Sequence, residues 1–270
     1  MPEKDTLMPA PVITLLTDFG ASDHYVAAMK GVALTICPAA QLVDISHDIA
    51  PYAVSDAAFT LSQAWSCFPA GTVHLIVIDP GVGTARRPIL VEASGHRFVA
   101  PDNGVLTMLY DAVPAHHVRE ITASRFFRQP VSRTFHGRDI FSPTAAHLAA
   151  GVAAADFGDA ITDYVRLGFA RAEQTGAKTW SGTILKIDRF GNLITNLNAE
   201  SWQHLGSQPF EIRIGWHVIA RMASNYAEMK SGELFVIPGS SGLLEISVNQ
   251  SSARQLLDAR SGDSLELRLL

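Results

Sequence analysis

The sequence has only two cysteines, Cys37 and Cys67, among its 270 residues. Two cysteines are too few for a metal site built from paired Cys-x-x-Cys motifs, and too few for a disulfide scaffold. Both lie in apolar stretches of the chain. We therefore predict two buried, free thiols in a reducing, cytoplasmic compartment.

Long apolar runs and runs of basic residues are also missing. No stretch approaches the roughly 18 apolar residues of a membrane helix. Residues 1–11 lack the apolar segment of a signal peptide, and we predict a short disordered arm there. The net charge is −5 and the pI is about 6.0. Together these absences predict no nucleic-acid partner and no membrane partner.

What the chain does have is a globular composition with 47% hydrophobic residues, enough for a sizeable core. Residues 12–170 alternate strand and helix patterns, which predicts an α/β domain with a doubly wound, mostly parallel sheet. The expected strands and helices are Val12–Leu16, Tyr25–Ile36, Gln41–Ile45, a helix capped by Ser55 and running to Trp65, Thr72–Ile78, and a hairpin around Ser94 and Gly95.

The pattern changes near residue 170. Residues 171–180 are polar and include Gly176, so we predict a linker there. Residues 181–270 then show short strand patterns separated by turn residues, which is typical of a small all-β barrel. The expected strands are Gly182–Ile187, Phe210–Ile214, Glu233–Ile237, Leu243–Val248 and Ser264–Leu269.

A turn directly after the third strand is the first candidate site. Asp79 begins it and Arg86 follows seven residues later, with Gly81 and Gly83 between them. Ligands of α/β proteins bind at the carboxyl ends of parallel strands. A carboxylate facing a guanidinium stays ionised and can orient a water molecule, although the same pair can simply brace a turn.

Other acidic and histidine side chains follow the first two strands. Asp18 suits a carboxylate that binds ribose hydroxyls, or a turn cap. His47 and Asp48 follow the second strand, and with Asp18 and Asp79 they form a candidate cation site that matches no specific metal motif.

Two later segments carry further candidates. His136 precedes an apolar helix and is suited to proton handling or to a loop hydrogen bond. Asp188, Phe190 and Asn192 lie in one turn, where they are suited to an ammonium group, a base face and a purine edge. The same Phe-Gly-Asn sequence also makes an ordinary turn. Asn249 ends an alternating strand whose polar members face either a ligand or solvent.

Seven short motifs in a fixed order resemble one known family. They are Thr17-Asp18-Phe19-Gly20, Ser46-His47-Asp48-Ile49, Asp79-Pro80-Gly81-Val82-Gly83-Thr84, Ala100-Pro101-Asp102-Asn103-Gly104, Phe135-His136-Gly137-Arg138-Asp139, Asp188-Arg189-Phe190-Gly191-Asn192 and Glu245-Ile246-Ser247-Val248-Asn249. Over nearly its whole length the chain resembles the S-adenosyl-L-methionine (SAM) hydrolases, also called SAM hydroxide adenosyltransferases. The bacterial fluorinating and chlorinating enzymes are relatives of that family.

The resemblance implies a fold, an assembly and a reaction. It implies an α/β domain followed by a β-barrel, and a homotrimer with SAM bound between the first domain of one subunit and the second domain of the next. The reaction implied is attack of water on the ribose 5′ carbon, which gives adenosine and L-methionine without a metal or redox cofactor.

The resemblance also implies a role for each matched residue. The catalytic residues are Asp79, Arg86 and His136. The implied substrate-binding residues are Asp18 for ribose, Tyr52 beside the substrate, Asp188 for the methionine amine and Asn192 for adenine. Phe190, for base stacking, and Asn249 are added to the substrate-binding set from their own residue types and positions.

The chain departs from the halogenating relatives at three positions, all of which favour water as the nucleophile. It has Asp79 where they have an aromatic residue, Gly137 where they have a serine, and the short turn Ser94-Gly95-His96 where they have a long loop. Their Ser-Arg contact to the methionine carboxylate reads Ser240-Ser241 here. Two alternatives remain: a metal-dependent hydrolase that uses the strand-end Asp and His residues, and a non-catalytic protein that binds adenosine or SAM.

Overall fold

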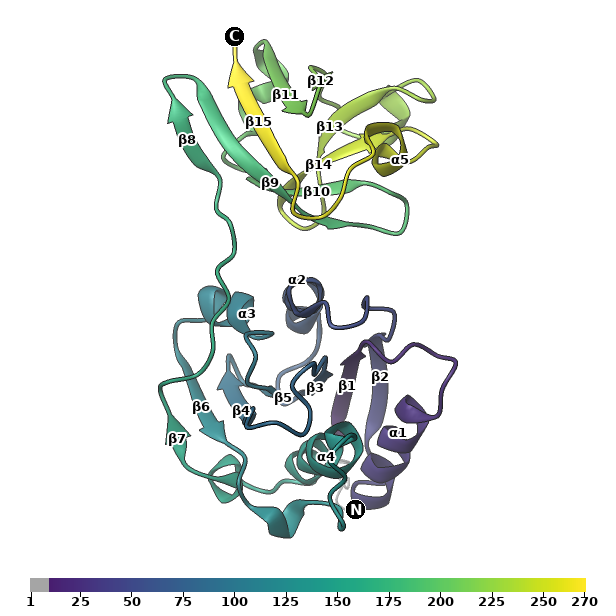
Figure 1. Ribbon diagram of the computed structural model, residues 1–270, viewed down its shortest axis with the longest axis vertical. Coiled ribbons are helices and arrows are strands. Elements are labelled where there is room, and N and C mark those ends of the chain that lie inside the picture. Colours follow the sequence, from purple (N-terminus) through teal and green to yellow (C-terminus); the bar gives the residue numbers. More distant parts are fainter. Residues whose placement is uncertain (1–9) are drawn as a thin grey trace, which may run out of the picture. The chain divides into compact units, whose positions relative to one another are not determined.

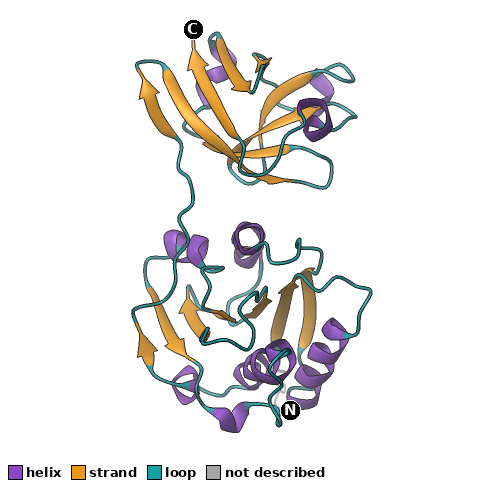
Figure 2. Cartoon of the chain, in the orientation of Figure 1, coloured by secondary structure: helices purple, strands orange, loops and turns teal. Residues whose placement is uncertain are grey.

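The computed structural model describes residues 10–270, so most of the predicted arm, residues 1–11, lies outside the described residues. The described chain forms two compact units that divide between Leu167 and Gly168. Figures 1 and 2 show an α/β unit followed by an all-β unit, and the predicted fold class is confirmed. No helix of the described residues is long and apolar enough to cross a membrane.

The first unit is built on a seven-stranded sheet with the order β2-β1-β3-β5-β4-β6-β7. The pairs β1–β2, β1–β3 and β3–β5 are parallel, and the remaining three pairs are antiparallel. The strands are β1 (Val12–Thr17), β2 (Gln41–Ser46), β3 (Val73–Val77), β4 (Pro88–Ala93), β5 (His96–Pro101), β6 (His116–Glu120) and β7 (Ala160–Ile161). The parallel half places the ends of β1 and β3 side by side, which matters for the site.

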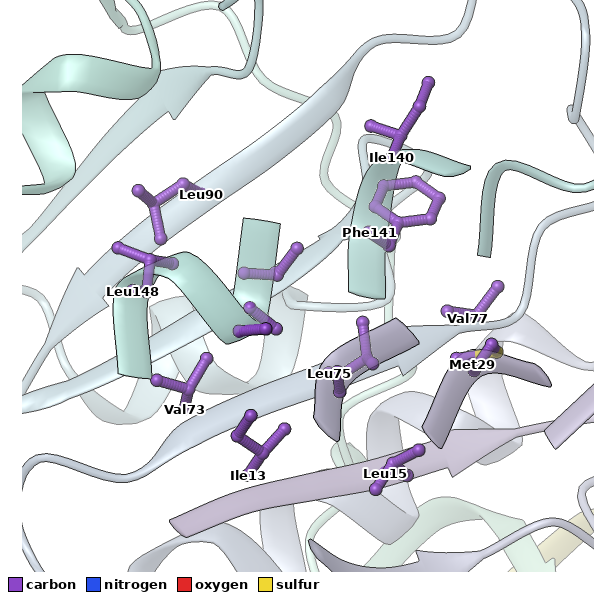
Figure 3. Close-up of a cluster of buried hydrophobic side chains, with 14 of the residues drawn as sticks. Ile13, Leu15, Met29, Val73, Leu75, Val77, Leu90, Ile140, Phe141 and Leu148 are labelled. Atoms are coloured by element: carbon purple, nitrogen blue, oxygen red, sulfur yellow. The ribbon is translucent and has the colours of Figure 1, made fainter. Parts of the chain in front are cut away.

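Both faces of this sheet are covered by helices, because the central strands are apolar on both sides. On β3, Leu75 and Val77 face one core while Ile76, and Ile78 directly after the strand, face the other. The first core includes α1 (Tyr25–Ile36) and α4 (Ser142–Ala149) and is drawn in Figure 3. The second includes α2 (Val54–Ala64) and α3 (Thr107–Ala112).

Two local expectations for this unit were wrong, and two strands were not foreseen. Ser55 does not cap α2, because the helix already begins at Val54. Cys67 is exposed, since it lies in the 3-10 turn η1 (Trp65–Cys67), whereas Cys37 is buried as expected; both are free. Residues 116–120 and 160–161 form two further strands that were not predicted, since the first is largely polar and the second has only two residues.

The second unit is a nearly closed antiparallel barrel with the strand order β12-β11-β15-β9-β10-β14-β13. Backbone hydrogen bonds between Val236 and the segment after β12 bring the two ends of the sheet together. Its elements are β8 (Glu173–Gly176), β9 (Thr179–Ile187), β10 (Leu193–Asn198), β11 (Phe210–Ile214), β12 (His217–Ile219), β13 (Leu234–Pro238), β14 (Leu243–Val248), α5 (Ala253–Leu257) and β15 (Ser264–Leu269), with 3-10 turns η5 (Gln203–Ser207) and η6 (Tyr226–Glu228).

The predicted linker differs from the structure. Residues 171–180 contain β8 and the start of β9, which pair with each other as a hairpin. All four residues of β8 are exposed, so the strand has no apolar face and its sequence looks like a linker.

Candidate active site

A cavity of ≈ 320 Å³ lies in the first unit at the carboxyl ends of β1 and β3. Asp18 follows β1 directly, and Asp79 lies two residues after β3. Parallel pairing of the two strands brings both carboxylates to one edge of the sheet. The lining residues are Asp18, Phe19, Pro51, Tyr52, Val77, Asp79, Val82, Thr134, Phe135, His136 and Gly137.

Asp79, Arg86 and His136 form one hydrogen-bonded group at this cavity. Arg86 Nε donates to Asp79 Oδ1 at 3.0 Å, and Arg86 Nη2 donates to Asp79 Oδ2. Arg86 Nη2 also lies 3.1 Å from His136 Nδ1. The side chains of Asp79 and Arg86 are only 5% and 7% exposed, so the pair is shielded from water. This geometry is a charge pair with a histidine attached to its cationic partner.

The contact with Arg86 fixes which nitrogen of His136 carries a proton. Guanidinium groups only donate hydrogen bonds, so Nδ1 must accept and the neutral ring carries its proton on Nε2. Burial and the charge of Arg86 lower the pKa of His136, and they outweigh the opposing effects of Asp79 and Asp139. At neutral pH, His136 is therefore a neutral ring with a donor at Nε2.

Asp18 faces the cavity with one oxygen already used. Its Oδ2 accepts a hydrogen bond of 2.9 Å from the backbone N of Tyr52, which has a φ of 66°. This left-handed conformation is uncommon for a non-glycine residue and is held here by the contact with Asp18. The Tyr52 side chain is 71% exposed beside the cavity. Asp18 Oδ1 remains able to accept from a ligand.

The candidate cation site does not assemble. His47 Nδ1 lies 2.8 Å from Thr17 Oγ1, and its Nε2 lies 3.0 Å from Asp44. Neither His47 nor Asp48 lines the cavity that contains Asp18 and Asp79. Within residues 10–270, no three His, Cys, Asp or Glu side chains are placed to hold a metal ion.

Gly137 begins a π-helical turn, Gly137–Phe141, that leads into α4. A Cβ at this position would lie 3.1 Å from Met29 Sδ and 3.3 Å from Val77 Cγ1. Such contacts are closer than a side chain normally tolerates, so the wall of the cavity is tightly packed at Gly137. A side chain larger than glycine would therefore be crowded at this position.

A second cavity of ≈ 760 Å³ lies in the barrel unit, and it collects the later group of predicted residues. Asp188, Phe190, Asn192 and Asn249 all line it. Phe190 is 78% exposed, which leaves its ring face available for stacking. Asn249 is held by a 2.6 Å hydrogen bond from its Nδ2 to Met229 O.

The Asp188 turn is braced from within. Asp188 Oδ1 accepts from the backbone N of Phe190 at 2.9 Å and of Asn192 at 2.8 Å, and its Oδ2 accepts from Asn192 Nδ2 at 2.8 Å. Gly191, with φ of 86°, makes the turn possible and packs against Ser252. The amide of Asn192 is thereby oriented by Asp188.

Among the polar residues of this cavity that the sequence did not assign individually are Glu245 and Tyr226. Glu245 is 8% exposed, and its Oε2 lies 3.5 Å from the hydroxyl of Tyr226, which in turn lies 3.5 Å from Asn192 Nδ2. Burial and the nearby charge of Asp188 raise the pKa of Glu245. The alternating strand Glu245–Asn249 was a signal for Glu245, whereas nothing in the sequence around Tyr226 distinguishes it from a surface tyrosine.

Comparison with known proteins gives matches over both units. The profile of the SAM hydroxide adenosyltransferase N-terminal domain matches residues 13–158, and that of the C-terminal domain matches residues 182–266. An (R)-S-adenosyl-L-methionine hydrolase of Salinispora tropica is 38% identical over 268 residues, which cover 97% of this chain and 99% of that protein. A fluorinase of Actinoplanes is 30% identical over 228 residues, covering 74% of this chain and 76% of that protein.

A solved structure supports the same relationship. An uncharacterized conserved protein from Thermotoga maritima superimposes with a TM-score of 0.89 at 37% identity, and the match covers 95% of this chain and 99% of that one.

Proposed function

The chain belongs to the SAM hydroxide adenosyltransferase family, and from that premise we propose that it is an enzyme that hydrolyses SAM to adenosine and L-methionine. The observation that carries the proposal is the hydrogen-bonded group of Asp79, Arg86 and His136 at a cavity that also contains Asp18. Because the characterised relatives are named for the (R) form, we propose the (R)-sulfonium diastereomer as the substrate.

The assigned chemistry needs no acid for the leaving group. The sulfonium of SAM leaves as a neutral thioether, so the protein has only to present a water molecule in line with the bond between sulfur and the 5′ carbon. Positioning of this kind contributes roughly 7–11 kcal/mol in the best intramolecular cases.

Asp79, Arg86 and His136 each have a different role toward that water molecule. Each Asp79 oxygen accepts one bond from Arg86 and retains a lone pair for a proton of the water. Neutral His136 donates from Nε2 to the water oxygen, and Asp79 takes up the proton that the water loses as its oxygen bonds to the 5′ carbon. Arg86 Nη1 is buried without a hydrogen-bond partner among residues 10–270, which leaves one more donor for the developing oxygen nucleophile.

The remaining predicted residues bind the substrate. We assign Asp18 to the ribose hydroxyls and Tyr52 to the rim beside them. In the barrel cavity we assign Phe190 to the adenine face, Asn192 and Asn249 to its polar edge, and Asp188 to the methionine ammonium group. Asp188 already accepts three hydrogen bonds. It therefore attracts the ammonium group by its charge and can accept one further hydrogen bond from it.

We also propose a cytoplasmic homotrimer in which neighbouring subunits share each site. Two free cysteines support the compartment. The sharing of sites is testable by mixing Asp79→Ala with Asn192→Ala subunits through unfolding and refolding. Recovery of activity in the mixed oligomer is expected. Inactive mixtures, or a monomer by light scattering, would exclude a shared site.

The reaction itself is tested in ¹⁸O-labelled water with excess chloride, by mass spectrometry of the nucleoside products. We expect adenosine with the label on the 5′ oxygen, because Asp79 repels halide and Gly137 has no hydroxyl to replace a halide's hydration. Detection of 5′-chloro-5′-deoxyadenosine, or of unlabelled adenosine, would contradict the hydrolase assignment. Binding without turnover would leave the non-catalytic alternative, and loss of activity with a chelator would leave the metal-dependent one.

A further inference from the structure

A buried carboxylate that the proposed chemistry does not use lies directly behind His136. Asp139 is 0% exposed and sits in the π-helical turn three residues after the histidine. Its Oδ1 accepts from Arg138 Nε at 2.7 Å and from Arg128 Nη1 at 3.3 Å. Its Oδ2 accepts from Arg138 Nη2 at 2.9 Å and from the backbone N of Ser132 at 2.9 Å. A buried charge needs such partners, and here all of them come from one short segment.

Backbone hydrogen bonds also join Asp139 to residues within that segment, which runs from residue 128 to residue 139. The backbone N of Arg128 donates to Asp139 O at 2.9 Å, and the backbone N of Asp139 donates to Phe135 O at 3.2 Å. No helix or strand is assigned between Phe126 and Gly137. The path of the segment is therefore set by bonds to Asp139 rather than by regular secondary structure.

The closed segment forms one wall of the cavity in the first unit. Thr134, Phe135, His136 and Gly137 all line it. The guanidinium of Arg138, held by Asp139, lies 5.0 Å from the centroid of the Phe135 ring. That ring also packs edge-on against Tyr25 at a centroid distance of 5.0 Å. Asp139 thus binds Arg138, which contacts the Phe135 ring in the cavity wall. Asp139 also lies in the π-helical turn that directly follows His136.

A second contact joins the segment to the turn that carries Asp79 and Arg86. Gly83 has a φ of 76°, and a Cβ there would overlap the carbonyl oxygen of Arg133. The two turns therefore touch backbone to backbone, so a displacement of the segment also disturbs the contact between His136 and Arg86.

We propose that Asp139 is a positioning residue of the hydrolysis: by closing residues 128–139 on itself, it holds His136 and Phe135 in place against the substrate cavity. This inference rests on the proposed function for its kinetic part only. A misplacement of about 1 Å in such a wall is enough to cost about 10²-fold in rate.

The pKa of His136 gives a measurement that depends on the charge of Asp139 and not only on its structural role. The charged groups facing His136 are Arg86 and Asp79 from the turn after β3, and Asp139 from its own turn. Arg86 lowers the pKa of His136, whereas Asp79 and Asp139 raise it. Removal of the Asp139 charge should therefore lower the pKa of His136 further.

The test compares Asp139→Asn with Asp102→Asn in the full-length chain. Asp102 is also a buried carboxylate of the first unit, paired with Arg87 Nη2 at 2.8 Å, but it lies outside the cavity lining. We expect Asp139→Asn to lower kcat by about 10- to 100-fold with a smaller change in KM, and to lower the pKa of His136 in NMR titration. Asp102→Asn should lose thermal stability but keep kcat and the titration of His136.

Equal kcat values for the two variants, or an unchanged titration of His136 in Asp139→Asn, would overturn the proposal. Should Asp139→Asn fail to fold, Arg138→Ala and Arg138→Lys replace it, since Arg138 is partly exposed. The Ala variant should lose kcat and the Lys variant should recover part of it; full activity of Arg138→Ala would overturn the proposal. The NMR titration needs no turnover, so it distinguishes failure of this inference from failure of the proposed reaction.

Discussion

The two cavities use acidic residues in opposite ways. In the α/β unit, Asp79 is paired with the charge of Arg86, and Arg86 contacts His136, so the polar groups hold one another in fixed positions. In the barrel unit, Asp188 is held by neutral backbone and amide donors, and Glu245 has a long contact to the hydroxyl of Tyr226. Opposite charges held together suit a step in which charge develops, whereas neutral donors and an exposed aromatic ring suit recognition. We therefore propose that the α/β unit carries the chemistry and that the barrel unit carries most of the recognition.

Replacement of Asp79 should have the largest effect. Asp79→Ala should lower kcat by roughly 10²- to 10⁴-fold, because one positioned catalytic group supplies about that much. Adenosine affinity should change little, as measured by calorimetry. The matched control is Asp48→Ala, an exposed acid near the end of the neighbouring strand β2 and outside the cavity. Turnover near the wild-type value in Asp79→Ala would contradict the assignment of the chemistry to the α/β unit.

Asp18 sharpens the comparison, because we propose it as a ribose-binding residue within the α/β unit, to which we assign the chemistry. Asp18→Ala should weaken adenosine binding by roughly 1.5–3 kcal/mol, the value of hydrogen bonds to a charged group. A 2′,3′-dideoxy analogue should bind both forms alike. If the analogue loses as much affinity as adenosine, Asp18 does not bind the ribose.

Phe190 tests the recognition unit by itself. Phe190→Ala should raise KM through the loss of base stacking, worth roughly 1–3 kcal/mol per base, while kcat stays within about two-fold. Trp216→Ala is the control, since this exposed aromatic of the same unit lies outside the cavity. A large fall in kcat with an unchanged KM would place Phe190 in the chemistry instead.

The two units should also respond to acid in opposite directions. Burial and the neighbouring His96 lower the pKa of His74 to about 3, so the folded α/β unit excludes a proton that the unfolded chain binds below pH 6.5. Its stability therefore falls as the pH drops from 6.5 towards 3, by about 2 kcal/mol at pH 5. Glu245, with its raised pKa, stabilises the barrel in acid and loses that contribution as the pH rises through its folded pKa.

Native-state hydrogen exchange of β3 and β14 at pH 5 and pH 7, corrected for intrinsic rates, measures this difference. His74→Gln should remove most of the pH dependence in β3, whereas His204→Gln, an exposed histidine of the barrel unit, should retain it. The same pH dependence in wild type and His74→Gln would contradict the assignment.

Sequence patterns were sufficient for elements whose burial is regular. The helix α1 (Tyr25–Ile36) and the strands β11, β14 and β15 have the bounds that their apolar patterns predict. Edge strands such as β7 and β8 escaped prediction, because partners elsewhere in the sheet, rather than an apolar face, define them. Exposure of Cys67 escaped for a related reason: the apolar residues around it pack in directions that only the fold sets.

In the candidate site, too, contacts between residues close in sequence could be predicted, whereas contacts between distant segments could not. Asp79 and Arg86 lie seven residues apart on either side of one turn, so their contact could be predicted from spacing. His136 lies 50 residues further along, and its contact with Arg86 depends on where residues 128–139 pack. The sequence by itself determined the two domain types, the order of the motifs and the turn at Asp79. Only the tertiary structure decided that His136 accepts from Arg86, that Glu245 faces the barrel cavity and that Asp139 lies beneath the wall, because burial and partners between distant segments set those roles.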